Sequence, residues 1–173
     1  MNILRVFVAV VVLAGVGLAQ ADHPAQRPAT ASAGFDLLKS LVGEWEGSMN
    51  KGGQVLPVTT TFRMVSDGSV LMNVLGAGTP HEMVTMFHLD NSNLLATHYC
   101  AVHNQPRFRF VPSPQANTVT FKFKDATNLA SPTTPHMVGL KITFVNANHH
   151  DEDWTFLADG KEGTTRFSFH RKG

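Results

Sequence analysis

Apolar and polar residues alternate along most of the chain after Glu44, and a period of two is the pattern of half-buried β-strands. The clearest example places Val119, Phe121 and Phe123 on one side of a strand, with lysines between them on the other side. About ten such strands are predicted, the first beginning at Glu44 and the others covering residues 58–64, 70–75, 81–89, 94–101, 107–111, 119–124, 138–144, 154–157 and 164–171. The pattern therefore indicates an all-β protein.

Turn-forming residues separate nearly every pair of predicted strands, so consecutive strands are expected to be neighbours. Asp67-Gly68 is a strong hairpin signal, and the segments 90–93 and 159–163 are rich in Asp, Asn, Ser and Gly. No helical period of useful length follows Val42. These features predict a closed antiparallel up-and-down β-barrel of about ten strands.

A short apolar segment, residues 35–42, resembles a helix and leads into Gly43-Glu44-Trp45. Gly43 allows a tight turn, and Trp45 supplies a large apolar side chain with one N–H donor. We expect Trp45 to close one end of the barrel, with the preceding helix as a lid. If Trp45 points inward, Glu44 and Glu46 both face solvent, which argues against a paired-carboxylate glycosidase.

The N-terminal residues 1–21 have the features of a cleavable signal peptide. Arg5 precedes an apolar run, and Ala19-Gln20-Ala21 fits the small-x-small cleavage rule, with an uncleaved anchor as the alternative. Residues 22–34 are interpreted as a flexible tether, which leaves 35–173 as the barrel domain. The sequence thus predicts a periplasmic or secreted protein with no membrane span after cleavage.

Composition narrows the class of protein further. Of the 173 residues, 43% are hydrophobic and 16% are charged, which argues against a disordered chain or a coiled coil. The formal net charge of +1 argues against a nucleic-acid-binding protein, which relies on neutralising phosphates. The single cysteine, Cys100, excludes an internal disulfide. The 12 Phe against 1 Tyr predict a dry interior filled with rings.

The predicted strands between residues 70 and 101 differ from the others because both of their faces are apolar. Val84 and Met86 lie on the face opposite to Met83 and Phe87. A sheet that is apolar on both faces needs two covers. One cover is the barrel interior, and the other is either the N-terminal tether or a second subunit, so a homodimer is one predicted assembly.

The stretch from Leu38 to Gly47, a short helix followed by Gly43-x-Trp45, resembles the opening of the calycin superfamily, which includes lipocalins, fatty-acid-binding proteins and nitrobindin-type barrels. The resemblance implies a basic residue on the last strand that packs over the tryptophan. Arg171 is the expected residue, through a cation–π contact that also caps the helix carbonyls. The segments 97–100 and 104–107 are similar to an uncharacterised group of secreted bacterial lipocalin-like proteins. The nitrobindin-type resemblance allows haem as a cofactor, although no histidine matches a haem motif.

The densest group of polar side chains lies between His98 and Arg107. His98 and Cys100 are two residues apart and therefore share one face of a strand. Together with Arg107 they are interpreted as the polar end of a ligand pocket, aimed at a group such as a carboxylate. The alternative is a hydrogen-bonded interior pair, with Arg107 tied to a buried backbone group or carboxylate.

The spacing within this group argues against a metal site and against catalysis by Cys100. His98 and Cys100 would need a third metal ligand, and a short hairpin turn that pairs Thr85 with His98 would put His88 on the opposite face. Two residues along a strand also separate side chains by roughly 6.5 Å, which is longer than a proton-transfer hydrogen bond. Catalysis by Cys100 is therefore not expected.

The second polar cluster is the segment 149–153, His-His-Asp-Glu-Asp. Adjacent residues of an extended segment point in opposite directions, which is poor geometry for a shared ligand. We interpret the segment as a solvated turn before Trp154, with a weak surface metal site as the alternative.

The sequence favours an exported binding protein that holds one small apolar or amphipathic molecule of unknown identity. Besides His98, Cys100 and Arg107, the predicted pocket is lined by Phe62, Phe121, Phe123, Ile142, Phe144, Trp154 and Phe156. Two alternatives stay open. One is a structural barrel filled by its own side chains, and the other is a small isomerase or hydrolase that uses His98 with Arg107.

Overall fold

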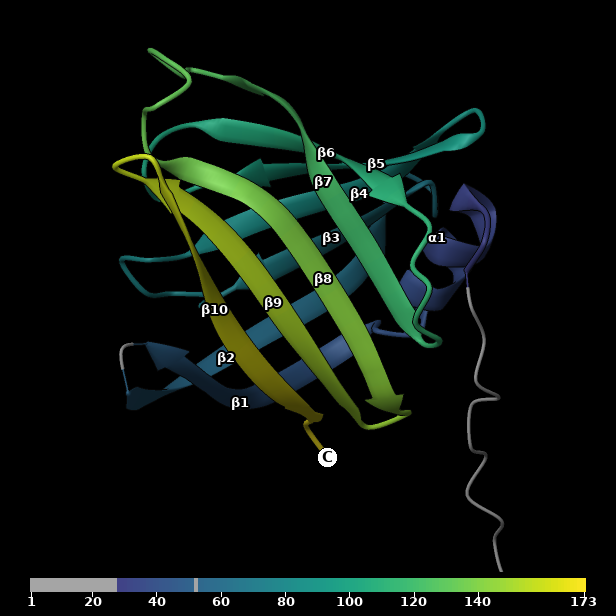
Figure 1. Cartoon of the computed structure of the whole chain (residues 1–173). Coiled ribbons are helices and arrows are strands. Elements are labelled where there is room, and N and C mark those ends of the chain that lie inside the picture. Colours follow the sequence, from purple (N-terminus) through teal and green to yellow (C-terminus); the bar gives the residue numbers. More distant parts are fainter. Residues whose placement is uncertain (1–27, 52) are drawn as a thin grey trace, which may run out of the picture.

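The computed structural model describes residues 28–51 and 53–173, so the predicted signal peptide and residues 22–27 of the predicted tether lie outside the described residues. One helix, α1 (Ala31–Lys39), precedes ten strands. The strands are β1 (Gly43–Lys51), β2 (Gln54–Val65), β3 (Val70–Leu75), β4 (Met83–Asp90), β5 (Asn93–Tyr99), β6 (Gln105–Val111), β7 (Thr118–Thr127), β8 (His136–Asn146), β9 (His149–Ala158) and β10 (Lys161–Arg171). Each strand pairs with its neighbours in sequence, and β1 pairs with β10 to close the barrel (Figure 1). The predicted fold class is confirmed.

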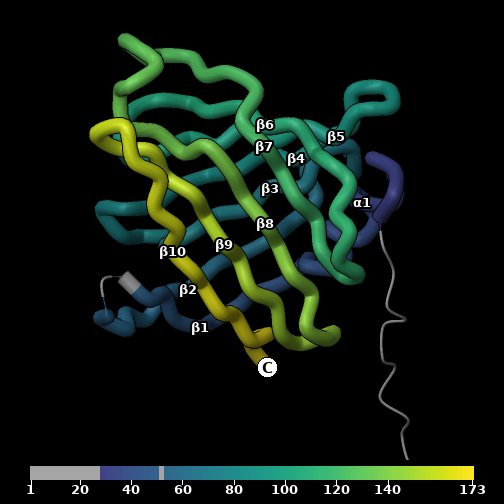
Figure 2. The backbone as a smooth tube through the Cα atoms, viewed as in Figure 1, coloured from purple at the N-terminus to yellow at the C-terminus, as the bar shows by residue number. Residues whose placement is uncertain are grey.

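The helix covers one end of the barrel, where it contacts β4, β5 and β7 (Figure 2). It begins at Ala31, so the last four residues of the predicted tether belong to it. Thr30 caps its N-terminus by accepting a hydrogen bond from the backbone N–H of Ala33. Phe35 and Leu38 on its apolar face join the core. We call the opposite end of the barrel the open end. It carries five connections between strands, β1–β2, β3–β4, β5–β6, β7–β8 and β9–β10.

The side chains of Trp45 on β1 and Arg171 on β10 connect the first and last strands of the barrel. Trp45 is 2% exposed, and its Nε1 donates to the carbonyl oxygen of Leu41 at 2.7 Å. The Arg171 guanidinium lies 4.2 Å from the centroid of the indole and donates to the carbonyl oxygens of Ser40 and Val42 at 2.9 and 2.8 Å. The cation–π contact and the capping of helix carbonyls implied by the calycin resemblance are therefore both present.

Two glycines on β1 make this closure sterically possible. Gly43 has a φ of +137°, and a Cβ there would lie 2.6 Å from Nη1 of Arg171. A Cβ on Gly47 would lie 1.9 Å from the backbone oxygen of Ser168. Because real Cβ atoms do not approach other atoms so closely, β1 can pack against β10 in this way only if residue 47 is a glycine.

The core fills the helix-capped half of the barrel. Side chains from the helix and from alternate positions of the strands are buried there together, among them Leu38, Leu41, Leu71, Phe87, Leu94, Phe108, Val119, Phe121 and Phe169. The period-two pattern of the sequence therefore corresponds to the inside and outside of the barrel wall.

Several strands are longer than the sequence predicted, and β9 exceeds its predicted bounds of 154–157 by the most. β9 begins at His149, and His150 and Glu152 point inward with Trp154, so all three side chains are buried. The prediction of a solvated turn over residues 149–153 is wrong. The inward positions of this segment are polar, so the apolar alternation that marks a half-buried strand is missing from the sequence.

The outer face of β3, β4 and β5 is apolar, in agreement with the sequence pattern. Cross-strand pairs join Met72 to Met86 and Val74 to Val84, and Tyr99, paired with Val84, is 50% exposed. A cover for this face, by the N-terminal segment or by a second subunit, stays a prediction.

Across residues 28–51 and 53–173, the structure has no helix of the length and apolarity that crossing a bilayer requires.

The closure predicts a large effect of substitutions at Arg171. Arg171→Ala removes the contact with Trp45 and the hydrogen bonds to Ser40 and Val42, so it should lower the free energy of unfolding by about 2–4 kcal/mol. Arg171→Lys keeps the charge but loses the planar fork, and should recover less than half of that loss. Urea denaturation measures both, with Arg109→Ala on the outer face of β6 as the control. If Arg171→Ala and Arg109→Ala had the same free energy of unfolding, the role assigned to Arg171 in closing the barrel would be contradicted.

Candidate functional site

A band of polar side chains crosses the inner wall of β2–β5. Asn73, Thr85 and His98 are cross-strand partners on β3, β4 and β5, and Asn73 Nδ2 donates to Thr60 Oγ1 on β2 at 2.6 Å. All four side chains are buried. We call Thr60, Asn73, Thr85 and His98 the polar band.

His98 is the titratable member of the polar band. Its Nδ1 lies 2.9 Å from Thr85 Oγ1, and its ring lies 4.7 Å from the ring of Trp154. The imidazole is 1% exposed, and burial lowers its pKa to about 4, so the ring is neutral at neutral pH. Among the described residues, its Nε2 has no hydrogen-bond partner. Two other buried atoms of the described residues, Asn104 Oδ1 and His150 Nδ1, likewise have no partner, and each such atom costs free energy.

A buried carboxylate lies on the far side of Trp154. Trp154 Nε1 donates to Glu152 Oε2 at 2.8 Å, and His150 Nε2 lies 3.3 Å from Glu152 Oε1. The His150 ring also packs edge-on against Trp45, with centroids 4.4 Å apart. The sequence analysis missed this group because His150 and Glu152 were assigned to a turn. Both residues alternate with Trp154, but because they are polar, this spacing alone does not mark them as inward-facing.

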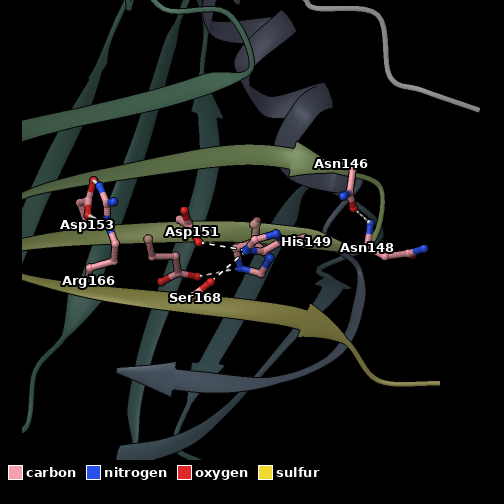
Figure 3. A network of polar contacts seen from close by, with 9 residues as sticks. Asn146, Asn148, His149, Asp151, Asp153, Arg166 and Ser168 are labelled. Carbon is pink, nitrogen blue, oxygen red and sulfur yellow. Dashed lines mark hydrogen bonds and ion pairs between the residues drawn. The ribbon is translucent and has the colours of Figure 1, made fainter. Parts of the chain in front are cut away.

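The outer face of the same strand carries a separate polar network (Figure 3). His149 Nε2 lies 2.9 Å from Ser168 Oγ and 3.2 Å from Asp151 Oδ1. Arg166 forms a bidentate pair with Asp153, and this pairing is the main reason that the pKa of Asp153 is lowered. Residues of β9 thus alternate between this outer network and the buried Glu152 group.

The structure places two of the three predicted polar wall residues together. His98 and Cys100 share the inner face of the barrel wall, and burial raises the pKa of the Cys100 thiol, which disfavours the nucleophilic thiolate. Arg107 lies on the outer face of β6 and pairs with Asp125, whose pKa is lowered mainly by that hydrogen bond. The structure therefore does not bring Arg107 to the wall that His98 and Cys100 form.

The mainly aromatic residues that were predicted to line the pocket divide into two groups. Those nearer to the helix are buried in the packed core, namely Phe62, Phe121, Ile142, Phe144 and Trp154. Phe123 and Phe156 are only half-buried. Side chains of the protein thus occupy much of the interior that the sequence analysis assigned to a ligand.

A cavity of about 440 Å³ lies at the open end. Its lining is mainly apolar and includes Met49, Leu56, Val58, Leu75, Met83 and Phe167. On β3 and β4, Leu75 and Met83 each lie two residues from a member of the polar band, Asn73 and Thr85. The polar band thus lies one inward position beyond the cavity on these two strands, and none of its four side chains lines the cavity.

A wider depression of about 690 Å³ extends across β7, β8, β9 and β10, around the point where the β7–β8 pairing ends at Lys122 and Gly139. Its lining includes the charged side chains Lys122, Lys141 and Asp153. Because Lys141 and Asp153 already form an ion pair at 2.8 Å, this surface is less suited to an apolar ligand than the open-end cavity is.

Metal coordination gains no support from the part of the chain that the structure describes. No group of three or more His, Cys, Asp or Glu side chains comes together there in a way that could hold a metal ion. His88 and His98 face opposite sides of the sheet, because Thr85 pairs with His98 and Leu95 with His88, as the hairpin argument predicted. Binding of haem stays a prediction.

Comparisons with known proteins relate the chain to other β-barrels by structure alone. No protein-family model matches the sequence, and no curated protein matches it. A protein of unknown function from the DUF3598 family of Nostoc punctiforme has a similar structure, with a TM-score of 0.55 and 14% identity. The alignment covers 92% of this chain and 53% of the Nostoc protein, so the chain spans about half of that protein's length. Rv2717c from M. tuberculosis aligns with a TM-score of 0.48 and 12% identity, over 81% of this chain and 98% of Rv2717c.

The low pKa of His98 predicts a loss of stability in acid. In the unfolded chain the imidazole has a pKa near 6.5, so below that pH the unfolded state binds a proton that the folded state does not. The free energy of unfolding should therefore fall as the pH decreases from about 6.5, by about 3 kcal/mol at pH 4. Urea denaturation across this range measures the effect.

The matched variants for this prediction are His98→Gln and His81→Gln. His98→Gln should remove this part of the pH dependence, whereas His81→Gln, at an exposed position, should keep it. If the free energy of unfolding of His98→Gln depended on pH as strongly as that of the unsubstituted protein, His98 would not be the source of the effect.

Proposed function

We propose that this protein binds a small apolar or amphipathic molecule in the open-end cavity. The observation that carries the proposal is the mainly apolar cavity of about 440 Å³ at the open end, whose wall includes the half-buried side chains of Met49 and Met83. This volume and this combination of an apolar wall with few polar groups are typical of small-molecule sites.

The open end is better suited to a ligand than the helix-capped half. Trp45, Phe62 and Phe121 fill the covered half and are almost fully buried, so a ligand there would have to displace core side chains. At the open end, Met49 and Met83 are only half-buried. Methionine side chains are flexible and polarisable, so they can adapt to a guest molecule.

A binding protein is favoured over an enzyme that uses His98 with Arg107. The two side chains lie on opposite faces of the barrel wall, and the guanidinium is paired with Asp125. Export of the protein to the periplasm or the medium is part of the proposal and rests on the sequence of residues 1–21.

Two methionines on opposite faces of β4 provide a matched test. Met83 lines the cavity, whereas Met86 points outward. Met83→Gln places an amide in the apolar wall and should weaken binding of N-phenylnaphthylamine, a neutral fluorescent probe, by about tenfold, equivalent to about 1.4 kcal/mol. Met86→Gln should leave the affinity unchanged.

Fluorescence titration measures both variants against the unsubstituted protein. If the unsubstituted protein does not bind the probe, or if both variants bind it as well as the unsubstituted protein does, the open-end cavity is not the binding site.

A further inference from the structure

We infer that the outer face of β3, β4 and β5 docks on the surface of a lipid bilayer that contains anionic lipids. Apolar side chains of this face contact the boundary between head groups and acyl chains, and basic side chains on either side contact lipid phosphates. We call the apolar residues of this surface the outer apolar face: Val70, Met72, Val74, Val84, Met86, Leu95 and Tyr99. The surface is separate from the open-end cavity, whose lining includes none of these residues.

The residues of the outer apolar face form one continuous surface. They occupy outward positions of three neighbouring strands, between side chains that point into the barrel. Cross-strand pairing joins Met72 to Met86. Val84 pairs with Val74 on one side and with Tyr99 on the other. Tyr99 is 50% exposed, and tyrosine is favoured at the level of the lipid head groups because its ring is apolar and its hydroxyl is polar. A continuous apolar surface on a water-facing wall marks an interaction site.

Basic side chains border the outer apolar face on both sides. On β2, Arg63 lies opposite Met72, with its Nη2 3.7 Å from Sδ of that methionine. On β6, Arg109 lies opposite Leu95, and Lys122 on β7 is the next cross-strand partner of Arg109. Among the described residues, none of these three basic side chains forms an ion pair. Their charge is therefore available to a partner.

Acidic side chains are scarce on this wall and lie on the opposite one. Strands β2 to β6 contain three arginines and a single acid, Asp90 at the end of β4. Asp125 on β7 is neutralised by two ion pairs. On the far side of the ring, β9 carries Asp151 and Asp153 outward and contains no lysine or arginine (Figure 3). The barrel can therefore turn its apolar and basic wall to an anionic surface while its acidic strand points away.

A second copy of the chain suits this face less well than a bilayer does. In a dimer with two-fold symmetry the face packs against itself, and because both of its borders are basic, like charges of the two copies would meet. Three strands about 4.8 Å apart, at the six-residue length of β3, span roughly 300 Å². Stable protein complexes bury roughly 800 Å² on each partner. Docking on a bilayer requires no matching shape, and methionine side chains can adapt to it.

A fluorescent label on each wall tests the inference. Thr97 lies beside the outer apolar face as the partner of Met86, and Thr155 is on the outer side of β9. Thr97→Cys and Thr155→Cys are each made in the full chain with Cys100→Ser and labelled with the environment-sensitive dye NBD. On addition of phosphatidylglycerol vesicles, the emission of the label at position 97 should rise and shift to the blue, whereas that at position 155 should not. Phosphatidylcholine vesicles, which carry no net charge, should produce a much smaller change.

The comparison of the two labels does not depend on residues 1–21. Insertion of their apolar run into vesicles would bring the barrel close to the bilayer without selecting one wall over the other. A response at position 97 that is absent at position 155 therefore reports docking by the outer apolar face.

Matched variants separate the basic and the apolar contributions. Arg109→Gln removes one border charge and should raise the vesicle concentration that gives half of the spectral change at position 97 by about fivefold, the effect of one basic residue at an anionic surface. Lys161→Gln removes the same charge at an exposed position of β10 and should leave this concentration nearly unchanged. Val84→Gln should likewise weaken docking, whereas Val145→Gln, at an exposed position of β8, should not.

The inference is overturned if the two labels respond alike, if neither responds, or if both kinds of vesicle produce the same change at position 97. Equal effects of Arg109→Gln and Lys161→Gln would also contradict it. A label at position 97 that is already shielded without vesicles would overturn it too, and would assign the face to a cover from the protein itself. A dependence of that shielding on protein concentration would identify the cover as a second copy.

Discussion

The pairing of β1 with β10 is the constraint on which the rest of the structure depends, because it turns a ten-stranded meander into a closed ring without free edges. The Trp45 indole and the Arg171 guanidinium stabilise this closure from opposite ends of the barrel domain. Arg171 also bonds to Ser40 and Val42, so the same side chain attaches the helix-to-strand connection to the last strand. Ring closure and coverage of one end are therefore coupled through one residue.

This coupling makes the two ends of the barrel different. At the covered end, Leu38 and Leu41 of the helical segment join the strand side chains in a packed core. At the open end, the β3–β4, β5–β6 and β7–β8 connections are five to eight residues long, and Met49 and Met83 are only half-buried. Packing is therefore tight at the covered end and looser at the open end, where the apolar cavity lies.

Much of the fold could be predicted from the sequence because the inner positions of most strands are apolar and the outer positions are polar. The alternation around Phe121 indicated its strand, and the Gly43-x-Trp45 motif indicated the closure. The prediction was wrong at residues 149–153, where polar residues occupy both faces of β9. Periodicity cannot distinguish a turn from a strand whose buried side chains are themselves polar, since burial of Glu152 depends on tertiary partners that the local sequence does not contain.

The candidate site could be predicted from the sequence only in part. The pairing of Thr85 with His98 followed from the hairpin, and it is the contact that orients the imidazole. The outward position of Arg107 was also accessible from the sequence, because Arg107 alternates with the buried Phe108 on the same strand. What could not be predicted is which interior positions are filled, since this depends on how side chains from all ten strands pack together.

The buried polar groups also bear on why the interior is not simply apolar. Polar side chains inside a core cost free energy unless each one is hydrogen-bonded, and apolar residues of similar size would usually be less costly. Every member of the band and of the Glu152 group has at least one hydrogen-bond partner, but one nitrogen of each buried imidazole, His98 Nε2 and His150 Nδ1, has none among the described residues. Each imidazole also packs against an indole, His98 against Trp154 and His150 against Trp45. The two histidines therefore combine one hydrogen bond with a ring contact, and this ring packing offsets part of the cost of the unpaired nitrogen.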